Sequence, residues 1–312
     1  MQFLEPAFLQ AIVLSVIAAS TPLLLAASGE LVAERAGVLN LGLEGMMIMG
    51  AACGFAGAYF TDSVIVGALA GVLAGVFMSA VFAALTLGLA VNQVAAGLAL
   101  TIFGIGLSGL IGAGFVGARI ETAPHLHLPV LTDIAVIGNI AFGQDAFVYA
   151  SLALVAGIWW FLYRTRAGLV LRAVGDNHVS AHALGYPVLR IRFWAVLFGG
   201  ACAGLGGAYL PLAYTPFFIP GMTAGRGWIA LALVVFASWK PERIVIGAYL
   251  FGAVTILQLH TQALGLGIPS QLMSSLPYLA TVIVLILISR VRSSTAGSTA
   301  PASLGVVFVP DR

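Results

Sequence analysis

The sequence of 312 residues contains few charged side chains. Asp, Glu, Lys and Arg together make up 8% of the chain, whereas 61% is hydrophobic and the mean hydropathy is +1.09. Soluble domains are about a quarter charged, so this chain has too few charges to cover a water-exposed surface. Uncharged runs of about 18 residues or more recur, and each can cross the ~30 Å hydrocarbon core of a bilayer. The composition therefore predicts a polytopic helical membrane protein and excludes a soluble enzyme.

Cysteine, lysine and early basic residues are also scarce. Cys53 and Cys202 fall within apolar runs, which is typical of buried thiols rather than of a disulfide or a metal site. The first residues, MQFLEPAF, carry no basic segment, so we expect no cleavable signal peptide. Lys240 is the only lysine and is followed by proline, and no G-x-x-x-x-G-K-[ST] motif occurs. The chain therefore cannot hydrolyse ATP through a P-loop of its own.

Nine apolar segments predict an all-α fold, a transmembrane helical bundle that forms a single domain over residues 1–292. They run roughly over 8–28, 42–60, 64–89, 93–114, 146–163, 193–212, 226–239, 244–260 and 275–289. The segments 226–239 and 275–289 are short, which predicts either a tilted helix in a thinned bilayer or a broken helix.

The basic residues set the expected orientation, because cytoplasmic segments of membrane proteins are enriched in Lys and Arg. If residues 164–192 are cytoplasmic, alternation of the spans puts nearly all other basic residues on that side and leaves only Arg119 and Arg226 outside. Nine spans then give an external N-terminus and a cytoplasmic C-terminus. The small, polar residues after 292 predict a flexible cytoplasmic tail over 293–312.

The segment 64–89 indicates how the helices pack. Small residues recur at every fourth position, at Gly67, Gly71, Gly75, Ser79 and Ala83. Helices associate in lipid through close backbone approach at such small residues. We therefore expect a tightly packed bundle, and Gly200 and Gly204 repeat the pattern in a later span.

The segment RTRAGLVLRAVGDNHVSAHALGYPVLRIR, between Arg164 and Arg192, gathers five arginines. Asp176 and Asn177 form a good N-cap pair, and HVSAHAL can form about two helical turns. Gly185 stands where a left-handed residue is expected to end the helix, and proline follows at 187. We therefore predict one short helix over about 176–185, since a plain connection between two spans would be far shorter.

Two interpretations of this segment remain open. The arginines at its two ends lie at the membrane borders, where anchoring to the cytoplasmic side alone would explain them. The short helix instead suits docking into a groove of a cytoplasmic partner, as a transporter driven by a separate motor subunit requires.

Several blocks of sequence carry a resemblance to a known family. The stretch RAVGDN…A…ALG…R.R, followed by FGGACAGLGGAYLPL, resembles the coupling-helix region of inner-membrane permeases of ATP-binding-cassette (ABC) importers for branched-chain amino acids, ribose and nucleosides. ERAGVLNLGLEGMMIMGA (34–51), NQVAAGLAL (92–100) and GMTAGRGWIALALVVFASWKP (221–241) resemble the smaller, simple-sugar permease of nucleoside importers. TAPHL, VIGNIAF and IPSQLMSSLPYL extend this resemblance over about residues 30–289.

The resemblance implies a permease subunit of the bacterial inner membrane, without a cofactor, that forms half of the translocation pathway for a nucleoside or a related sugar-containing solute. It implies an ATPase with two cassette domains, a second and larger permease, and a periplasmic or lipoprotein substrate-binding protein as partners, but no nucleic acid. It places contacts with the ATPase on Arg172, Gly175, Asp176, Asn177, His178, His182 and Gly185. His178 stands where the family usually has proline, so the coupling helix is expected to begin less rigidly.

Histidines occur in two pairs. His178 and His182, four residues apart, can share one helix face and bind a metal ion. No glutamate accompanies them as in H-E-x-x-H, and no further ligand is near. The same holds for His125 and His127, for which local capping or hydrogen bonding is the favoured interpretation, so we predict no metal site.

Polar residues beside the spans are candidates for the transport pathway, because burying them in lipid is costly. Asn40 and Glu44 belong to a glycine-rich entry into the second span, LNLGLEG. Glu44 is expected either to contact sugar hydroxyls in the pathway or to form an ion pair or cap near the cytoplasmic border, for example with Arg35.

Three further polar residues lie at span ends. Asn92 and Gln93 open the fourth span and either bind a polar solute or cap a helix at a tight turn. Arg226 precedes a short span on the outer side, where it either lines the outer mouth, contacts a binding protein or pairs with an acidic residue of the external loop.

Other classes of function fit the sequence less well. An ion-coupled secondary transporter would need acidic sites at the membrane midplane and broken helices in both halves, and Glu44 is the one acidic residue expected inside the membrane. An intramembrane enzyme would need a Ser/His/Asp or two-Asp constellation on facing spans, which is not evident. Within the importer class, ribose, another sugar or a branched-chain amino acid is the alternative solute.

Overall fold

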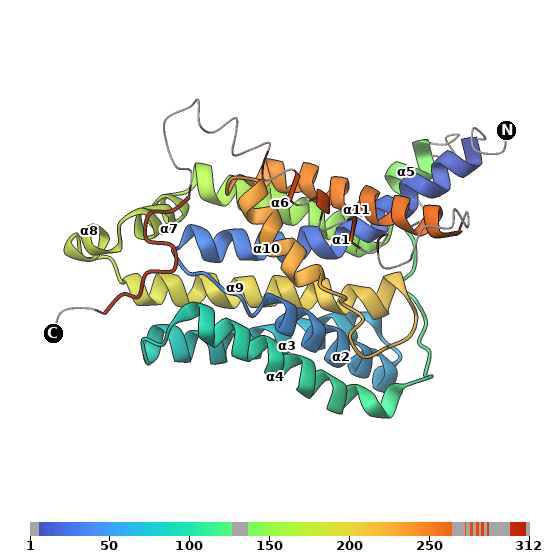
Figure 1. Cartoon of the computed structure of the whole chain (residues 1–312), viewed down its shortest axis with the longest axis horizontal. Coiled ribbons are helices and arrows are strands. Elements are labelled where there is room, and N and C mark those ends of the chain that lie inside the picture. The colour runs from blue at the N-terminus through green and yellow to red at the C-terminus, as the bar shows by residue number, and fades with distance from the viewer. Residues whose placement is uncertain are drawn as a thin grey trace.

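The computed structural model describes residues 6–126, 137–263 and 300–309, together with eight isolated positions between 272 and 286. These residues form helices, and the strand-like pairing among them is limited to two isolated bridges, Arg119 with Phe217 and His125 with Asp145. Figure 1 shows the long helices side by side along the long axis of the molecule.

The helices follow one another in this order. α1 (Pro6–Arg35), α2 (Leu43–Thr61) and α3 (Val64–Ala83) come first, and α3 continues into the π-helical turn η2 (Ala84–Gly88). α4 (Gln93–Gly112) ends in the 3-10 turn η3 (Ala113–Phe115), and the short α5 (Ile137–Phe142) precedes α6 (Ala146–Arg164). α7 (Arg166–Asp176) and α8 (His178–Ala183) lead to α9 (Val188–Tyr209), which continues into the π-helical turn η4 (Leu210–Tyr214). α10 (Arg226–Phe236) and α11 (Pro241–Ala263) follow.

Seven helices are long and apolar enough to cross a membrane. They lie within 8–35, 43–61, 64–88, 93–115, 146–164, 188–214 and 241–262, and each overlaps a predicted span. The predicted span 226–239 is instead the 11-residue helix α10, which covers ~16 Å, about half of a bilayer core. The predicted span 275–289 lies outside the described residues apart from isolated positions. The chain is thus a multi-span helical membrane protein, but the described residues do not establish nine spans.

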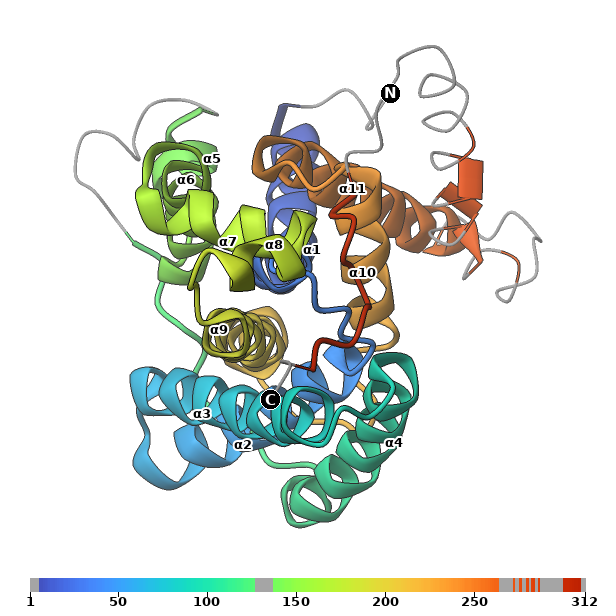
Figure 2. The ribbon, with the colours of Figure 1, turned by 90° about the vertical axis from the view of Figure 1, so that its left-hand side faces the viewer.

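α1 lies at the centre of the molecule. Figure 2 shows α1 between α6 on one side and α10 and α11 on the other, with α9 beside it and α2, α3 and α4 forming a separate group beyond α9. From Ser20 to Glu34 every residue of α1 is buried. Because this part of α1 is packed on all sides, it has no exposed polar face opposite a buried apolar one.

The predicted strip of small residues on α3 lies against α2 and α9. A Cβ atom added to Gly75 would lie 2.0 Å from the carbonyl oxygen of Gly200, and one added to Gly204 would lie 2.2 Å from that of Gly71. These backbones are therefore in direct contact, and no larger side chain fits between them. Packing through small residues is the way helices associate in lipid, and the prediction is confirmed.

The start of α2 is broken away from the end of α1. α1 ends at Arg35, and residues 36–42 run without helix before α2 begins at Leu43. Gly45, in the first turn of α2, packs against Leu100 and Thr101 near the middle of α4. The N-terminus of α2 therefore lies inside the bundle rather than at its end.

The segment between α6 and α9 contains two helices rather than the one predicted. α7 covers Arg166–Asp176 before α8 begins at His178. α7 is amphipathic: Leu171, Val174 and Gly175 are buried while Leu169 and Asp176 are exposed. Figure 1 places both helices at one end of the bundle, beside the described C-terminal residues.

Candidate functional site

Glu44, in the first turn of α2, binds the N-terminus of α10 inside the bundle. Its Oε1 accepts hydrogen bonds from Oγ1 of Thr223 (2.6 Å) and N of Gly225 (3.0 Å), and its Oε2 accepts one from N of Gly227 (2.6 Å). The first N–H groups of a helix have no partner within that helix and carry partial positive charge. The Glu44 carboxylate, 6% exposed, supplies both the hydrogen bonds and the negative charge that the N-terminus of α10 needs.

This geometry decides part of the open question about Glu44. The side chain caps a helix, as one interpretation held, but the helix is α10 and the position is the middle of the bundle. Arg35 is not its partner, because the Arg35 guanidinium donates through Nε (3.0 Å) and Nη2 (2.7 Å) to the carbonyl oxygen of Trp239. The pathway interpretation of Glu44 stays a prediction.

Both ends of α10 have left-handed backbone. Ala224 and Gly225 precede the helix with φ of 47° and 82°, and Ser238 and Trp239 follow it with φ of 52° and 56°. Such conformations cost energy for residues other than glycine and are maintained only where the surroundings fix them. At the C-terminal end, Arg35 and Glu34 fix this conformation. Arg35 binds the carbonyl oxygen of Trp239, and Oε2 of Glu34 accepts a hydrogen bond from Nε1 of Trp239.

Arg226 lies at the N-terminus of α10, between the two residues whose N–H groups bind Glu44. Its Nη1 donates to the carbonyl oxygens of Met222 (3.0 Å) and Thr223 (3.2 Å), and its guanidinium lies over the ring of Tyr214, 5.8 Å from the centroid. The sequence placed Arg226 on the outer side, at the start of a span. The structure places it at the middle of the bundle, half-buried, because α10 is a half-length helix that begins beside α2.

Asn40 and Gln93 hold the non-helical segment 36–42. Oδ1 of Asn40 accepts a hydrogen bond from N of Gly42 (2.9 Å), and Oε1 of Gln93 accepts one from N of Leu39 (2.8 Å). Both side chains are buried, at 1% and 2% exposure. Asn92 is exposed and caps α4, because its Oδ1 accepts a hydrogen bond from N of Ala95 (3.1 Å).

At the end of the bundle, α8 has the caps that the sequence predicted. Oδ1 of Asn177 accepts a hydrogen bond from N of Ser180 (2.9 Å), so Asn177 is the N-cap of the pair. Gly185 has φ of 86° after the helix ends, and Pro187 directly precedes α9. Val179 of α8 and Leu184, directly after the helix, are 64% and 78% exposed, so two large apolar side chains face outward here.

Residues 300–309 pack against the inner side of this helix, although the sequence predicted a flexible tail there. N of Ser303 donates to the carbonyl oxygen of Gly175 (2.9 Å), and N of Gly305 donates to that of Gly37 (3.2 Å). Pro301 and Ser303 are buried. The packed tail joins the end of α7 to the segment that follows α1.

Arg192, with 0% exposure, joins three segments below α8. Its Nε donates to the carbonyl oxygen of Ala36 (3.1 Å) and its Nη1 to that of Val306 (3.0 Å), while Nη2 lies 3.3 Å from Nδ1 of His178. Main-chain carbonyls therefore surround a guanidinium that the sequence placed at the membrane border.

The remaining residues expected at the coupling helix occupy different environments. His178 and His182 both pack their rings on Phe308, with centroids 5.0 Å and 5.3 Å away, so they share a face without a metal ligand arrangement. Arg172 lies over the ring of Tyr163, 5.1 Å from its centroid. The carbonyl oxygen of Asp176, at the exposed end of α7, accepts a hydrogen bond from Oγ of Ser303 (3.4 Å).

Comparison with known proteins matches the sequence to one family. Residues 12–290 match the permease component of branched-chain amino acid transport systems. The chain belongs to this permease family. The assignment covers most of the chain and agrees with the resemblance that the sequence motifs carry.

Three relatives of the permease align over most of their length. A protein of Haloferax volcanii provisionally named as a glucose ABC transporter permease, TsgC13, is 42% identical over 86% of this chain and 88% of its own. The nucleoside ABC transporter permease NupC of Lactococcus lactis is 34% identical over 89% and 92%. The guanosine ABC transporter permease NupQ of Bacillus subtilis is 31% identical over 88% and 92%.

Two acidic residues of the permease were missed by the sequence analysis. Glu30 and Glu34, one helical turn apart on α1, are 0% and 1% exposed. Oε1 of Glu30 accepts a hydrogen bond from N of Asn40 (3.2 Å). The predicted first span ends at residue 28, whereas α1 continues to Arg35, so Glu44 is not the one acidic residue buried within the long helices. The spacing of the two glutamates, which places both on one helix face, was the signal that could have revealed them.

Replacing Glu44 by glutamine tests the junction between α2 and α10. The glutamine NH₂ group is a donor and would face N–H or O–H donors that now bind the carboxylate, so at least one hydrogen bond is lost. We expect a loss of about 1–3 kcal/mol in stability and reduced transport, measured by thermal unfolding and by solute uptake. Glu242→Gln, at the exposed first turn of α11, is the matched control. Wild-type stability and uptake in Glu44→Gln would contradict the proposed junction.

The contact of His178 with the tail is expected to depend on pH. Burial, together with the nearby Arg192 guanidinium, lowers the pKa of His178 from its ordinary value of 6.5. When residues 300–309 are released from His178, the imidazole binds a proton more readily than when they are packed on it. The packed tail is therefore favoured above pH 6.5 and loses stability as the pH falls toward the lowered pKa. A spin label at Val309→Cys should gain mobility between about pH 7.5 and pH 5.5. His178→Gln should abolish this gain in mobility, and His182→Gln should keep it. The reverse result would show that His182, and not His178, controls the release of the tail.

Proposed function

We propose that this permease is one subunit of an ATP-driven ABC importer that moves a sugar-containing solute, either a nucleoside or a free sugar, across the bacterial inner membrane. The structural observation that carries the proposal is a mid-bundle junction between the start of α2 and the half-length helix α10, in the same bundle that presents a capped helix at one end. Half-length helices that end at membrane depth are typical of transporter solute sites.

The substrate class follows from what the relatives share. Their names give glucose, nucleosides and guanosine as solutes, and each of these compounds contains a sugar ring. Polar groups that can face a sugar lie around the junction, where Arg226 is half-buried next to Glu44. A branched-chain amino acid is the alternative solute within the family.

The proposed partners follow from what the chain lacks. It has no P-loop, so ATP hydrolysis would occur on a separate ATPase with two cassette domains. We propose that this ATPase docks on α8, that a second and larger permease completes the pathway, and that a periplasmic or lipoprotein binding protein delivers the solute. Binding of these partners requires a single permease domain over residues 1–292, with an external N-terminus and a cytoplasmic C-terminus.

A continuous series of contacts leads from α8 to the junction. His178 of α8 contacts Arg192, and Arg192 binds the carbonyl oxygen of Ala36. Ala36 begins the non-helical segment 36–42, which leads into the first turn of α2, and Glu44 in that turn holds α10. We propose that displacement of α8 by the ATPase moves this segment and so changes the position of α10. Packed elements of this kind can transmit a displacement where each has two discrete arrangements.

Reconstitution distinguishes the importer from an ion-coupled transporter. We expect vesicles that contain the permease alone to accumulate no nucleoside or sugar under a proton or sodium gradient. Vesicles that contain all four proteins should accumulate one of these solutes when ATP is supplied, and the binding protein should bind the same solute in isolation. Accumulation by the permease alone under an ion gradient would overturn the proposal. The control is needed because Glu30 and Glu34 are acidic residues inside the bundle, as an ion-coupled transporter requires.

Substitutions at Gly185 test the proposed docking of the ATPase on α8. Gly185 has φ of 86°, and a Cβ atom there would meet nothing within 4 Å. The effect of a substitution therefore comes from backbone conformation rather than from collision. Asparagine tolerates the left-handed region and valine does not, so Gly185→Val should weaken co-purification with the ATPase and lower uptake several-fold, while Gly185→Asn retains both. Equal behaviour of the two variants would remove α8 from the docking surface.

A further inference from the structure

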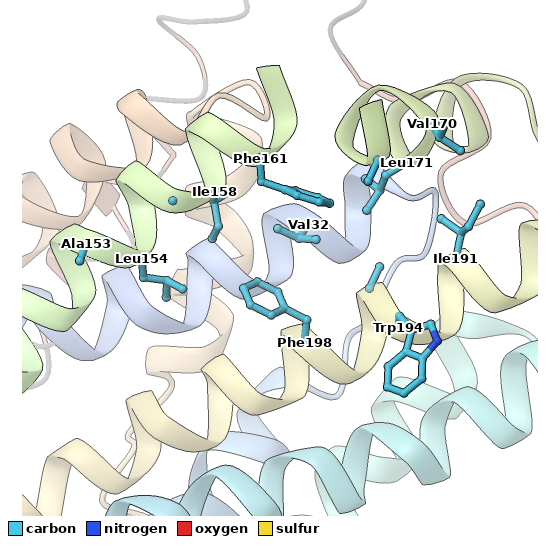
Figure 3. Close-up of a pocket in the computed structure, with 13 residues that line it drawn as sticks. Val32, Ala153, Leu154, Ile158, Phe161, Val170, Leu171, Ile191, Trp194 and Phe198 are labelled. Carbon is cyan, nitrogen blue, oxygen red and sulfur yellow. The ribbon is translucent and has the colours of Figure 1, made fainter. Parts of the chain in front are cut away.

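A large apolar cavity opens between α1, α6, α7 and α9, away from the junction at Glu44. Its volume is ≈ 730 Å³. Figure 3 shows Val32 of α1 at its base, with Ile158 and Phe161 of α6, Leu171 of α7 and Phe198 of α9 around it. The volume lies within the range of sites that bury a small organic ligand.

The cavity wall is apolar throughout. Every lining residue is aliphatic, aromatic, alanine or glycine, with Trp194 as the one side chain that carries a polar atom. Gly157 lies on α6 in the wall, and a Cβ atom added there would meet nothing within 4 Å. The cavity is therefore unfilled beside Gly157 and suits a hydrocarbon chain.

Three arginines lie close in sequence to lining residues, at the end of the bundle where α7 lies. Arg164 ends α6, Arg166 begins α7 and Arg190 lies in the first turn of α9, and all three are exposed. They stand within three residues of the lining residues Phe161, Ala167 and Ile191. Between residues 164 and 200 the one acidic residue is Asp176, at the opposite end of α7 from Arg166.

The character of the wall argues against a second helix as occupant. Helices associate in lipid through small residues that permit close backbone approach, as α3 and α9 do at Gly75 and Gly200. The cavity instead carries bulky side chains at Phe161, Trp194 and Phe198, with Trp194 68% exposed. An apolar site with a basic border on the cytoplasmic side is typical of binding to anionic lipid head groups.

We propose that this cavity binds one anionic phospholipid of the cytoplasmic leaflet, with an acyl chain against α1, α6 and α9 and the phosphate near Arg164, Arg166 and Arg190. The proposal rests on the proposed cytoplasmic side of α7, and not on the identity of the transported solute. The lipid would fill the space between α6 and α9, the two helices that flank the α7–α8 segment.

Native mass spectrometry of the full permease in detergent, with added phosphatidylglycerol or phosphatidylcholine of equal chain length, tests the proposal. We expect one phosphatidylglycerol to be retained in preference to phosphatidylcholine. Arg164→Gln or Arg190→Gln should each lower this preference about fivefold, the effect of one basic residue near an anionic lipid. Arg119→Gln, an exposed arginine outside the cavity border, should leave it unchanged.

Filling the cavity gives a second and independent measurement. Gly157→Leu should abolish retention of the phospholipid, because the new side chain occupies the space of the acyl chain. Gly106→Leu is the matched control, since Gly106 is an exposed glycine of α4 with nothing within 4 Å of an added Cβ atom. Equal retention of both lipids by the wild type, or unchanged retention in Gly157→Leu, would overturn the proposal. Neither result would affect the importer assignment, because the assay measures no transport.

Discussion

The carboxylate of Glu44, buried inside the bundle, holds two interrupted helices together. Backbone N–H and C=O groups that leave a helix within a bilayer find no water, so each needs a partner within the protein. α10 begins at such a depth, and Glu44 satisfies the N–H groups of Gly225 and Gly227. Glu44 itself lies in the first turn of α2, so one side chain connects the starts of both helices.

Two glutamates of α1 serve the other irregular segments in the same way. Glu30 binds the backbone of Asn40 within the non-helical segment, and Glu34 binds the indole of Trp239 where α10 ends. The continuous helices are held differently, through backbone contact between Gly75 and Gly200. Packing of small residues thus forms a rigid frame of α2, α3 and α9, while acidic side chains attach the interrupted segments to it.

The sequence predicted the long helices because their apolar runs match the thickness of a bilayer, and it predicted the caps at Asn177 and Gly185 because these depend on neighbouring residues. It did not predict the depth at which α10 begins, since hydropathy does not distinguish a half-length helix from a tilted one. The contacts of Glu44 and Arg192 also escaped prediction, because most of their partners are main-chain atoms more than a hundred residues away. Main-chain partners leave no trace in side-chain chemistry, which is why small polar residues near 303 suggested a flexible tail.

The packing of residues 300–309 has a consequence for biosynthesis. These residues are synthesised after the seven membrane-crossing helices of the described part of the chain, yet they supply Val306 to Arg192 and Phe308 to the two histidines of α8. The contacts that support α8 can therefore form only once translation has passed residue 308. A nascent or prematurely terminated chain would insert its spans with α8 unsupported. Cellular quality control could use this unsupported helix to distinguish such a chain from one that contains residues 300–309.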